Sequence, residues 1–347
     1  MSKRTKKKNI INLVSLAVII IATVLVLKEN NNKGTIPENI SNFAIEDTSK
    51  ITKIFIADMQ GKSITLERIN NNWKVNGKYK ANLNRINLML SLLNNLEVKS
   101  PTSESAKDNV IKEMATQAEK IEIYQGTEKP SKVIYVGGST QNLEGTYMAL
   151  DRGKRKEKIP FVVHDPTFRG YLSDGYFYTE ENEWRTKEVF TFDPTQISKV
   201  KVRYLFSKEN SFNLTIDKNN KFLFSDFNDK KCPSQEIDTK LIKKFLMGFS
   251  DLQFITIDKY IKKNVKDSIL HVRPIASIYV ENTKGYSQQL NIYYKPSNRK
   301  TRVEIEGGFD KERYYGIIKN RPNDIVILQT LRLNRILWKF EDFKIKK

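Results

Sequence analysis

Residues 47–54 read DTSKITKI, and 146 positions later residues 193–200 read DPTQISKV. Both stretches begin with an aspartate and end in two apolar residues separated by two polar ones. Further matches recur at nearly the same offset, between Ile86, Leu90, Leu93, Leu96 and Ile242, Leu246, Phe249, Leu252, and between residues 109–110, 123–124 and 264–265, 278–279. Near-constant offsets with matched apolar positions indicate internal repetition. The sequence therefore predicts two tandem copies of one domain, at residues 43–180 and 185–343.

Each copy is expected to combine an antiparallel sheet with helices. Alternating apolar and polar residues and short apolar runs predict strands at residues 51–57, 63–68, 73–75, 120–124, 132–136, 146–150 and 161–163. Apolar side chains at helical spacing predict a helix over residues 83–96. A second helix is predicted over residues 106–119, with Ser103 or Ser105 as its cap. We therefore expect an α+β fold, made twice, with the helices packed on one face of each sheet.

A glycine-containing stretch between two of these strands, YVGGSTQNLEGTYMAL at residues 135–150, raises the question of nucleotide binding. A phosphate loop needs a helix directly after the glycines, because the helix amino terminus binds the anion. Residues 146–150 are strand-like instead, and the spacing of Gly137, Gly138 and Gly145 matches neither nucleotide fingerprint. The sequence predicts a turn between two strands.

The amino terminus carries the signals of a membrane anchor. Residues 1–9 form a basic tail, and residues 10–27 are apolar apart from Asn12, Ser15 and Thr23. A helix over these 18 residues would cover about 27 Å of hydrocarbon. The positive-inside rule places the basic tail in the cytoplasm and exports the remaining chain. A cleaved signal peptide is the alternative, although bulky residues occupy the expected cleavage site. Residues 28–42 are polar and predict a flexible tether.

Composition limits the possible functions. The chain has 347 residues, 39% of them hydrophobic, which is enough for one large or two ordinary cores. Its net charge is +20, and the positive charge is spread beyond the basic tail. Codon usage is the favoured explanation, and a basic face toward anionic lipid, glycan or protein is the alternative. Cys232 is the one cysteine, so an intramolecular disulfide and a cysteine-based zinc site are excluded. Nucleic acid is a poor partner for an exported domain, and no cofactor motif is found.

Candidate site residues are few. The densest basic cluster, a possible contact for anionic groups, comprises Arg152, Lys154, Arg155, Lys156 and Lys158. Its position between two strand-like runs also suits a solvated turn. His164 with Asp165 could act as an acid-base pair, but its place at the end of an apolar run favours a strand-end role. Carboxylates are scattered, so a glycosidase pair is not indicated. Trp73, Trp184 and Trp338 could stack on sugars, but core packing explains them more simply.

Several segments resemble a bacterial membrane-anchored family known as domain of unknown function 4340. They are residues 42–79, EVKSP at 97–101, KIEIYQG at 120–126, YVGG at 135–138, GTYMAL at 145–150 and PFVVHDPTFRGYL at 160–172. The resemblance is densest in the first copy, and Asp193-Pro194 is its clearest echo in the second. It implies an association with ABC-type export permeases or gliding-type components, as a transport accessory without catalysis. It brings no catalytic residues to transfer.

Two hypotheses of different classes follow. In the first, the chain is a single-pass protein of the bacterial cytoplasmic membrane, whose extracytoplasmic part is a non-catalytic binding or scaffold module for an envelope protein, such as an ABC-type permease. In the second, it is an envelope glycan-binding protein or hydrolase that uses scattered carboxylates. A broad surface favours the first hypothesis, and a cleft with converging carboxylates favours the second.

Overall fold

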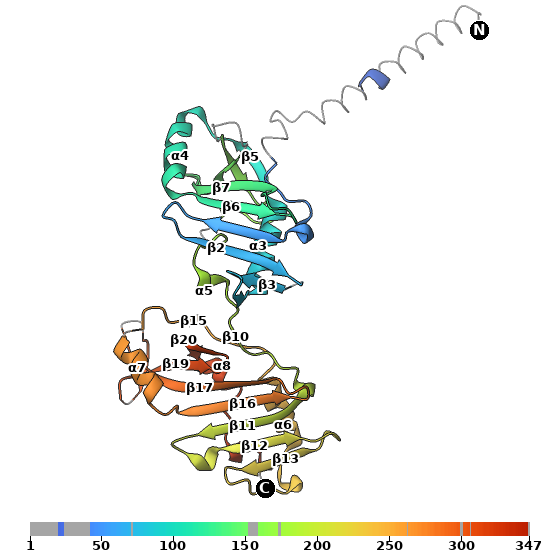
Figure 1. Ribbon diagram of the computed structural model, residues 1–347, viewed down its shortest axis with the longest axis vertical. Helices are drawn as coiled ribbons and strands as arrows, with labels where there is room; N and C mark the ends of the chain where they lie inside the picture. The colour runs from blue at the N-terminus through green and yellow to red at the C-terminus, as the bar shows by residue number, and fades with distance from the viewer. Residues whose placement is uncertain are drawn as a thin grey trace, which may run out of the picture. The chain divides into compact units, whose positions relative to one another are not determined.

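The computed structural model divides the chain into two compact units, Met1–Thr186 and Lys187–Lys347 (Figure 1). Each unit is described by itself. The residues that the structure describes are 20–23, 42–70, 72–151, 159–172, 175–261, 263–298, 301–305 and 307–345.

The predicted membrane span, residues 10–27, lies outside the described residues except for 20–23, which are helical. In the described part of the chain, no helix has the length and apolar character needed to cross a membrane. The basic tail at 1–9 and most of the tether at 28–42 are likewise outside the described residues.

The first unit contains one antiparallel sheet of nine strands, in the order β4-β3-β2-β1-β6-β7-β8-β9-β5. The strands are β1 (Lys53–Ala57), β2 (Ser63–Ile69), β3 (Asn72–Val75), β4 (Tyr79–Lys80), β5 (Glu97–Pro101), β6 (Glu119–Tyr124), β7 (Lys132–Ser139), β8 (Thr146–Leu150) and β9 (Pro160–His164). A short 3-10 helix, η1 (Thr48–Lys50), precedes β1. The strands predicted for this part of the sequence are confirmed, and the mixed helix and sheet content confirms an α+β fold.

Two longer helices accompany this sheet. Helix α3 (Leu83–Asn95) begins at Asn82, whose side-chain oxygen accepts hydrogen bonds from the backbone N–H groups of Asn84 and Arg85. Helix α4 (Glu104–Gln117) begins after Ser103. A short helix, α5 (Glu181–Trp184), ends the unit.

The expectation that both helices cover one face is wrong. Ile134 and Val136 of β7 share a core with α3, whereas Tyr135 between them packs with Val110 and Met114 of α4. Because successive strand residues point to opposite faces, α3 and α4 lie on opposite faces of the sheet. The burial of β7 and β8 is continuous rather than alternating, as in strands covered on both sides.

The turn predicted in residues 135–150 is confirmed, because β7 and β8 pair as an antiparallel hairpin. Gly137 lies in β7 beneath α4, where an added Cβ would stand 2.7 Å from Met114 Cγ. At Gly145, an added Cβ would stand 2.5 Å from Val162 Cγ1. Gly137 therefore permits the close approach of α4 to β7, and Gly145 permits the close approach of Val162 in the neighbouring strand β9.

The second unit has an antiparallel sheet in the order β13-β12-β11-β16-β17-β19-β20-β15, with β18 paired to β19, and a small sheet of β10 and β14. The strands are β10 (Glu188–Phe190), β11 (Ile197–Tyr204), β12 (Phe212–Ile216), β13 (Phe222–Asp226), β14 (Leu252–Gln253), β15 (Thr256–Ile257), β16 (Ala276–Asn282), β17 (Ser287–Pro296), β18 (Glu304–Ile305), β19 (Phe309–Ile318) and β20 (Arg321–Gln329). Its order therefore repeats β3-β2-β1-β6-β7-β8-β9-β5 of the first unit strand by strand.

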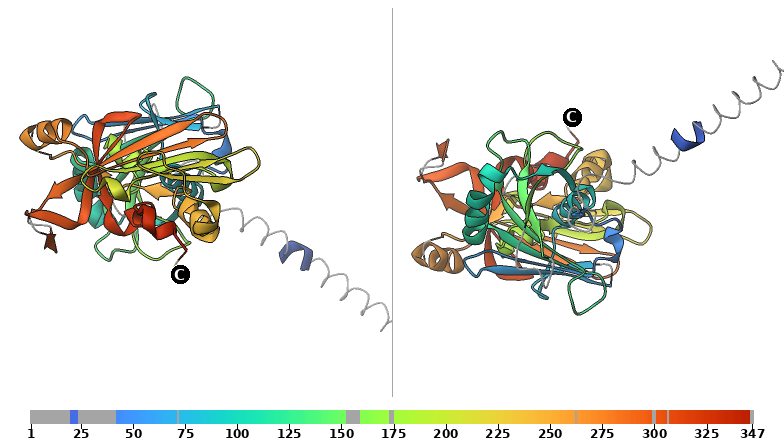
Figure 2. Two further views of the ribbon diagram at one scale, coloured as in Figure 1. Left: turned by 90° about the horizontal axis from the view of Figure 1, so that it is seen from below. Right: turned by 90° about the horizontal axis from the view of Figure 1, so that it is seen from above.

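Helices of the second unit also take both faces of their sheet. They are η2 (Pro194–Gln196), η3 (Lys208–Asn210), η4 (Ser234–Glu236), α6 (Thr239–Met247), α7 (Lys263–His271), α8 (Thr330–Leu333) and η5 (Phe340–Phe343). Helix α6 packs in the core with Ile292 of β17, and α7 packs with the neighbouring Tyr293. Figure 2 (left) shows α7 in orange and α6 in yellow-orange on opposite sides of the strands.

A carboxyl-terminal strap closes each unit in the same way. We call residues 181–186 the first strap and residues 340–345 the second. In the first, Trp184 O accepts a hydrogen bond from Asn82 N–H at 2.7 Å. In the second, Phe343 O accepts one from Asp238 N–H at 2.9 Å. Asn82 and Asp238 cap α3 and α6, so each strap is fixed to the residue that begins its unit's first long helix.

Candidate functional site

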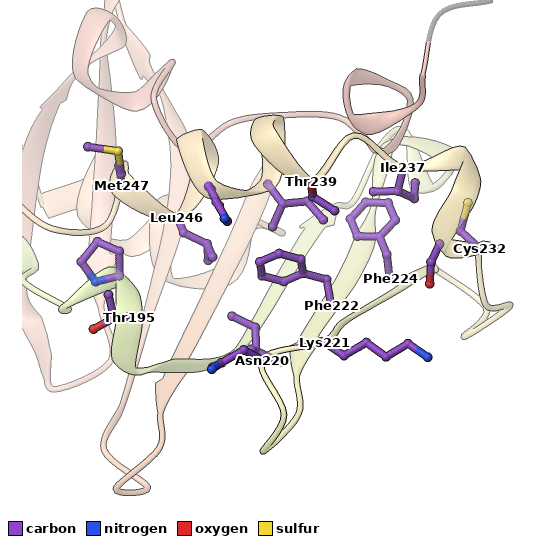
Figure 3. A pocket seen from close by; sticks show the side chains of 15 residues that line it. Thr195, Asn220, Lys221, Phe222, Phe224, Cys232, Ile237, Thr239, Leu246 and Met247 are labelled. Atoms are coloured by element: carbon purple, nitrogen blue, oxygen red, sulfur yellow. The ribbon is translucent and has the colours of Figure 1, made fainter.

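The second unit contains an apolar groove of about 760 Å³, between α6 and the β12–β13 hairpin. Its lining residues come from η2, β12, the β12–β13 turn, β13, the β13–α6 connection and α6. Figure 3 shows Phe222 and Phe224 pointing from β13 toward Leu246 and Ile237, with Thr195 at one end and Cys232 at the other. We call this cavity the α6 groove.

Local sequence explains how the walls form. The β12–β13 turn is closed by Asp217, whose carboxylate accepts the backbone N–H groups of Asn219 at 2.9 Å and Lys221 at 2.8 Å. Asn220 takes a positive φ of 58° in this turn, which asparagine tolerates well. On the opposite wall, Asp238 caps α6 by accepting the N–H of Lys240 at 2.8 Å.

The groove combines an apolar floor with a basic rim. Ile216, Ile242 and Leu246 join the two phenylalanines on the floor. Lys221 from the hairpin and Lys243 from α6 are the charged lining residues, and the described lining contains no carboxylate. Neither lysine has an ion-pair partner within the described part of the chain. The groove is therefore suited to a ligand that is partly apolar and carries negative charge.

Cys232 does not have the properties of a nucleophile. Burial raises the pKa of its thiol, and nearby Glu236, whose carboxylate lies 3.8 Å from Sγ, raises it further. A raised pKa leaves less thiolate, which is the reactive form. The groove is thus arranged for binding rather than for thiol chemistry.

The corresponding place in the first unit is filled by an arginine. Arg68 in β2 pairs with Trp73 in β3, as Ile216 in β12 pairs with Phe222 in β13. The Arg68 guanidinium lies 4.9 Å from the centre of the Trp73 ring and donates to the carbonyl oxygens of Thr48 and Ser49 in η1. Isoleucine at position 216 has no group that could bridge to η2.

The two units also differ at the outer edge of the hairpin. In the first unit, β4 pairs with β3, and Ala81 N–H donates to Trp73 O at 2.9 Å. In the second unit, Cys232 N–H donates to Phe224 O at 2.9 Å, but the chain then turns away at Pro233 into η4. The connection leaves the edge of β13 near Phe222 without such a strand.

The candidate residues taken from the sequence do not gather at this groove. The basic cluster of Arg152, Lys154, Arg155, Lys156 and Lys158 lies outside the described residues. Asp165 is buried and accepts the N–H and hydroxyl of Thr167 at 2.8 and 2.7 Å, so its carboxylate serves a turn after His164.

Other candidates have structural positions. Trp73 and Trp184 are buried in the first core, and Trp338 packs against the second, as core packing predicts. Among the described residues, no three His, Cys, Asp or Glu side chains form a group that could hold a metal ion. The α6 groove was not predicted from the sequence. The available signal was the exchange of Arg68 for Ile216, which becomes visible only when the strands of the two units are aligned.

Comparison with known families gives one match. A family described as a domain of unknown function, DUF4340, matches residues 73–269, which is more than half of the chain. The matched region begins in β3 and ends in α7, so it includes parts of both units. All the residues that line the α6 groove lie within it. No curated protein and no solved structure matches the chain. The chain belongs to the DUF4340 family.

Proposed function

We propose that this chain is a non-catalytic binding module in which the α6 groove of the second unit recognises a partner protein in the cell envelope. The observation that carries this proposal is the open, apolar groove with a basic rim in the second unit, at a place that Arg68 fills in the first. A groove of about 760 Å³ lies within the size range of ligand sites.

We also propose that the two units are tandem copies of one domain. Support comes from their matching strand order, from helices on both faces, and from straps that bind the helix caps Asn82 and Asp238. Two copies with one open groove suggest a division of roles. The first copy has the closed form of the site, and the second has the form that binds.

The proposal also includes attachment to the bacterial cytoplasmic membrane through residues 10–27, with both units outside the cytoplasm. Its support is the apolar run behind a basic tail. On this arrangement the partner is an envelope protein, and a transport permease is one such partner. The carboxylate-based glycan hypothesis has no corresponding observation in the described lining of the groove, which carries lysines instead.

Photo-crosslinking in intact cells tests the proposal. A photoreactive amino acid replaces Met247 in the full chain, because this residue lies at the groove rim and is 63% exposed. We expect one dominant adduct with an envelope protein, and we expect Ile216→Arg to abolish it. An adduct with wall glycan would instead support the alternative function.

The matched control position is Leu143, which is 52% exposed in the first unit. Thermal unfolding of purified Ile216→Arg establishes that this variant folds. The proposal is wrong if probes at Met247 and Leu143 capture the same proteins, or if a folded Ile216→Arg chain captures the Met247 partner as well as the unmodified groove does.

A further inference from the structure

We infer that the α6 groove takes an extended, acidic peptide segment of its partner, which adds to the outer edge of β13 as a further strand. This inference rests on the proposed function and specifies what part of the partner is recognised. Three features of the groove support it: a free strand edge, an internal example of how that edge is filled, and the charge of the rim.

The outer edge of β13 has backbone groups available for pairing. Phe222 and Phe224 lie on the same side of the ladder, because alternate residues of an antiparallel strand direct their N–H and C=O groups to the same edge. Phe224 O accepts from Cys232 N–H, which identifies this edge as the outer one. No described residue pairs with the N–H or C=O of Phe222 on that edge.

The first unit shows what occupies the equivalent edge. There β4 and Ala81 follow Trp73 as an added strand, and the first strap pairs beyond them with Ala81. In the second unit, Ile237 pairs with the second strap in the same manner, but its N–H donates to Ser234 within η4. The strand contact that Ala81 supplies to Trp73 is thus missing at Phe222.

The connection that follows the hairpin is two residues longer in the second unit than in the first. Lys78 N–H donates to Val75 O in the first unit, as Cys232 N–H donates to Phe224 O in the second. Ala81 follows three positions after Lys78, whereas Ile237 follows five positions after Cys232. The longer connection includes Pro233, which has no N–H to give to a strand. This difference in length explains why the chain does not close its own edge.

The charge and shape of the walls define the peptide. Side chains of a strand alternate, so every second residue of an added segment would face the apolar floor formed by Ile242 and Leu246. One residue of that groove-facing row would lie near Lys243 of α6, and residues on the opposite face of the added strand would lie on the side of Lys221. Neither lysine has a carboxylate partner in the described structure. Glutamate or aspartate at these positions would form the missing ion pairs.

Peptide binding to the purified chain tests the inference. The probe is an acetylated, amidated peptide whose groove-facing positions are valine and tyrosine with one glutamate, and whose alternate positions are glutamate. Its binding is followed by fluorescence anisotropy. A second peptide has the same side chains but methylated backbone nitrogens on the edge that would face β13. Loss of the hydrogen bond to Phe222 O, together with the bulk of the methyl groups at the strand edge, should weaken binding by about tenfold or more. A peptide with lysine in place of glutamate should bind more weakly still.

Variants locate the site. Ile216→Arg recreates the arrangement of Arg68 and should prevent binding, while Arg68→Ile in the first unit should leave the affinity unchanged. Lys243→Glu changes an exposed side chain, so the fold should persist. It should weaken binding by about fivefold and reduce the salt dependence of the affinity.

The outcomes separate the inference from the proposed function. Equal binding of the methylated peptide would show that no strand is added, and failure of the acidic peptide to bind would also overturn the inference. Displacement of the peptide by dodecanoate, with affinity that rises about fourfold per methylene in longer homologues, would assign the groove to an anionic amphiphile. In each case, a groove-dependent adduct in cells would leave the proposed function standing.

Discussion

Lys295 and Asp310 form an ion pair inside the second unit, with only 2% and 0% of their side chains exposed. Lys295 Nζ lies 3.5 Å from Asp310 Oδ2 and also donates to Pro296 O at 3.2 Å. The other carboxylate oxygen, Oδ1, accepts the N–H of Glu312 at 2.9 Å. Arg313 Nε also lies 3.8 Å from Asp310 Oδ2. Because both charges of the pair are removed from water, the Lys295 ammonium depends on Asp310 for compensation, whereas Asp310 has two cationic partners.

Asp310→Ala should therefore destabilise the chain by about 3–5 kcal/mol, because it leaves the Lys295 ammonium buried and unpaired. Urea unfolding measures the change. In the Asp310→Ala background, Lys295→Met should restore much of the lost free energy, because it removes the uncompensated charge. Two single substitutions whose effects simply add would contradict a coupled pair.

Gly137 has a packing role, because its lack of a side chain allows α4 to approach β7. Gly137→Ala would place a methyl group 2.7 Å from Met114 Cγ and 3.2 Å from the carbonyl oxygen of Tyr147. We expect a loss of about 1–3 kcal/mol of stability from overpacking. Thermal unfolding of Gly137→Ala in a Met114→Ala background should show a smaller loss, and an equal loss would mean that Met114 is not the obstacle.

At the scale of elements, most of each sheet follows from patterns visible in the sequence. Period-two alternation predicts β1 and β2, and helical spacing of Ile86, Leu90 and Leu93 predicts α3. The positions of α4 and α7 on the second face were not predicted, because a continuous apolar run does not say what covers each side. The groove was missed for another reason: it results from one side chain, Ile216, and from the length of one connection.

The straps are the elements with the clearest mechanical role. Trp184 is buried in the first unit, and its indole N–H donates to Tyr178 O at 2.8 Å. Trp184→Ala should cost about 3–5 kcal/mol, because a large cavity opens beneath the strap. Chemical unfolding followed by circular dichroism measures this loss. Leu143→Ala, on the surface of the same unit, should change stability by no more than about 0.5 kcal/mol.

The stability of the whole molecule should fall at alkaline pH, because the second unit buries several tyrosine hydroxyls. Burial raises the pKa of Tyr204, Tyr293, Tyr314 and Tyr315, and donation to Asp258 raises that of Tyr315 further. Tyrosines in the unfolded chain lose their protons near pH 10, whereas these residues keep theirs. Stability is therefore full below about pH 10 and falls as the pH rises above it.

Thermal unfolding between about pH 8 and pH 11 checks this expectation, because the midpoint should stay constant at first and fall above pH 10. Tyr315→Phe removes one of the titrating groups and should make the fall less steep. A midpoint that rises above pH 10, or a slope that Tyr315→Phe leaves unchanged, would contradict the assignment.

The DUF4340 match, from β3 to α7, includes the hairpin, the connection and the helix that form the α6 groove. The two similar units therefore differ at one place, because the hairpin edge is filled in the first unit and open in the second. That difference concerns individual backbone groups, and so it can be measured on the chain without knowledge of its partner.

Amide hydrogen exchange of β13 is the most direct measurement. In the free chain, the Phe222 amide should exchange rapidly, while the neighbouring Leu223 amide, which faces Thr215 of β12, should be protected. Addition of the acidic peptide should protect the Phe222 amide as well. If the Phe222 amide is already as slow as that of Leu223 in the free chain, the edge is not open, and the central claim is contradicted.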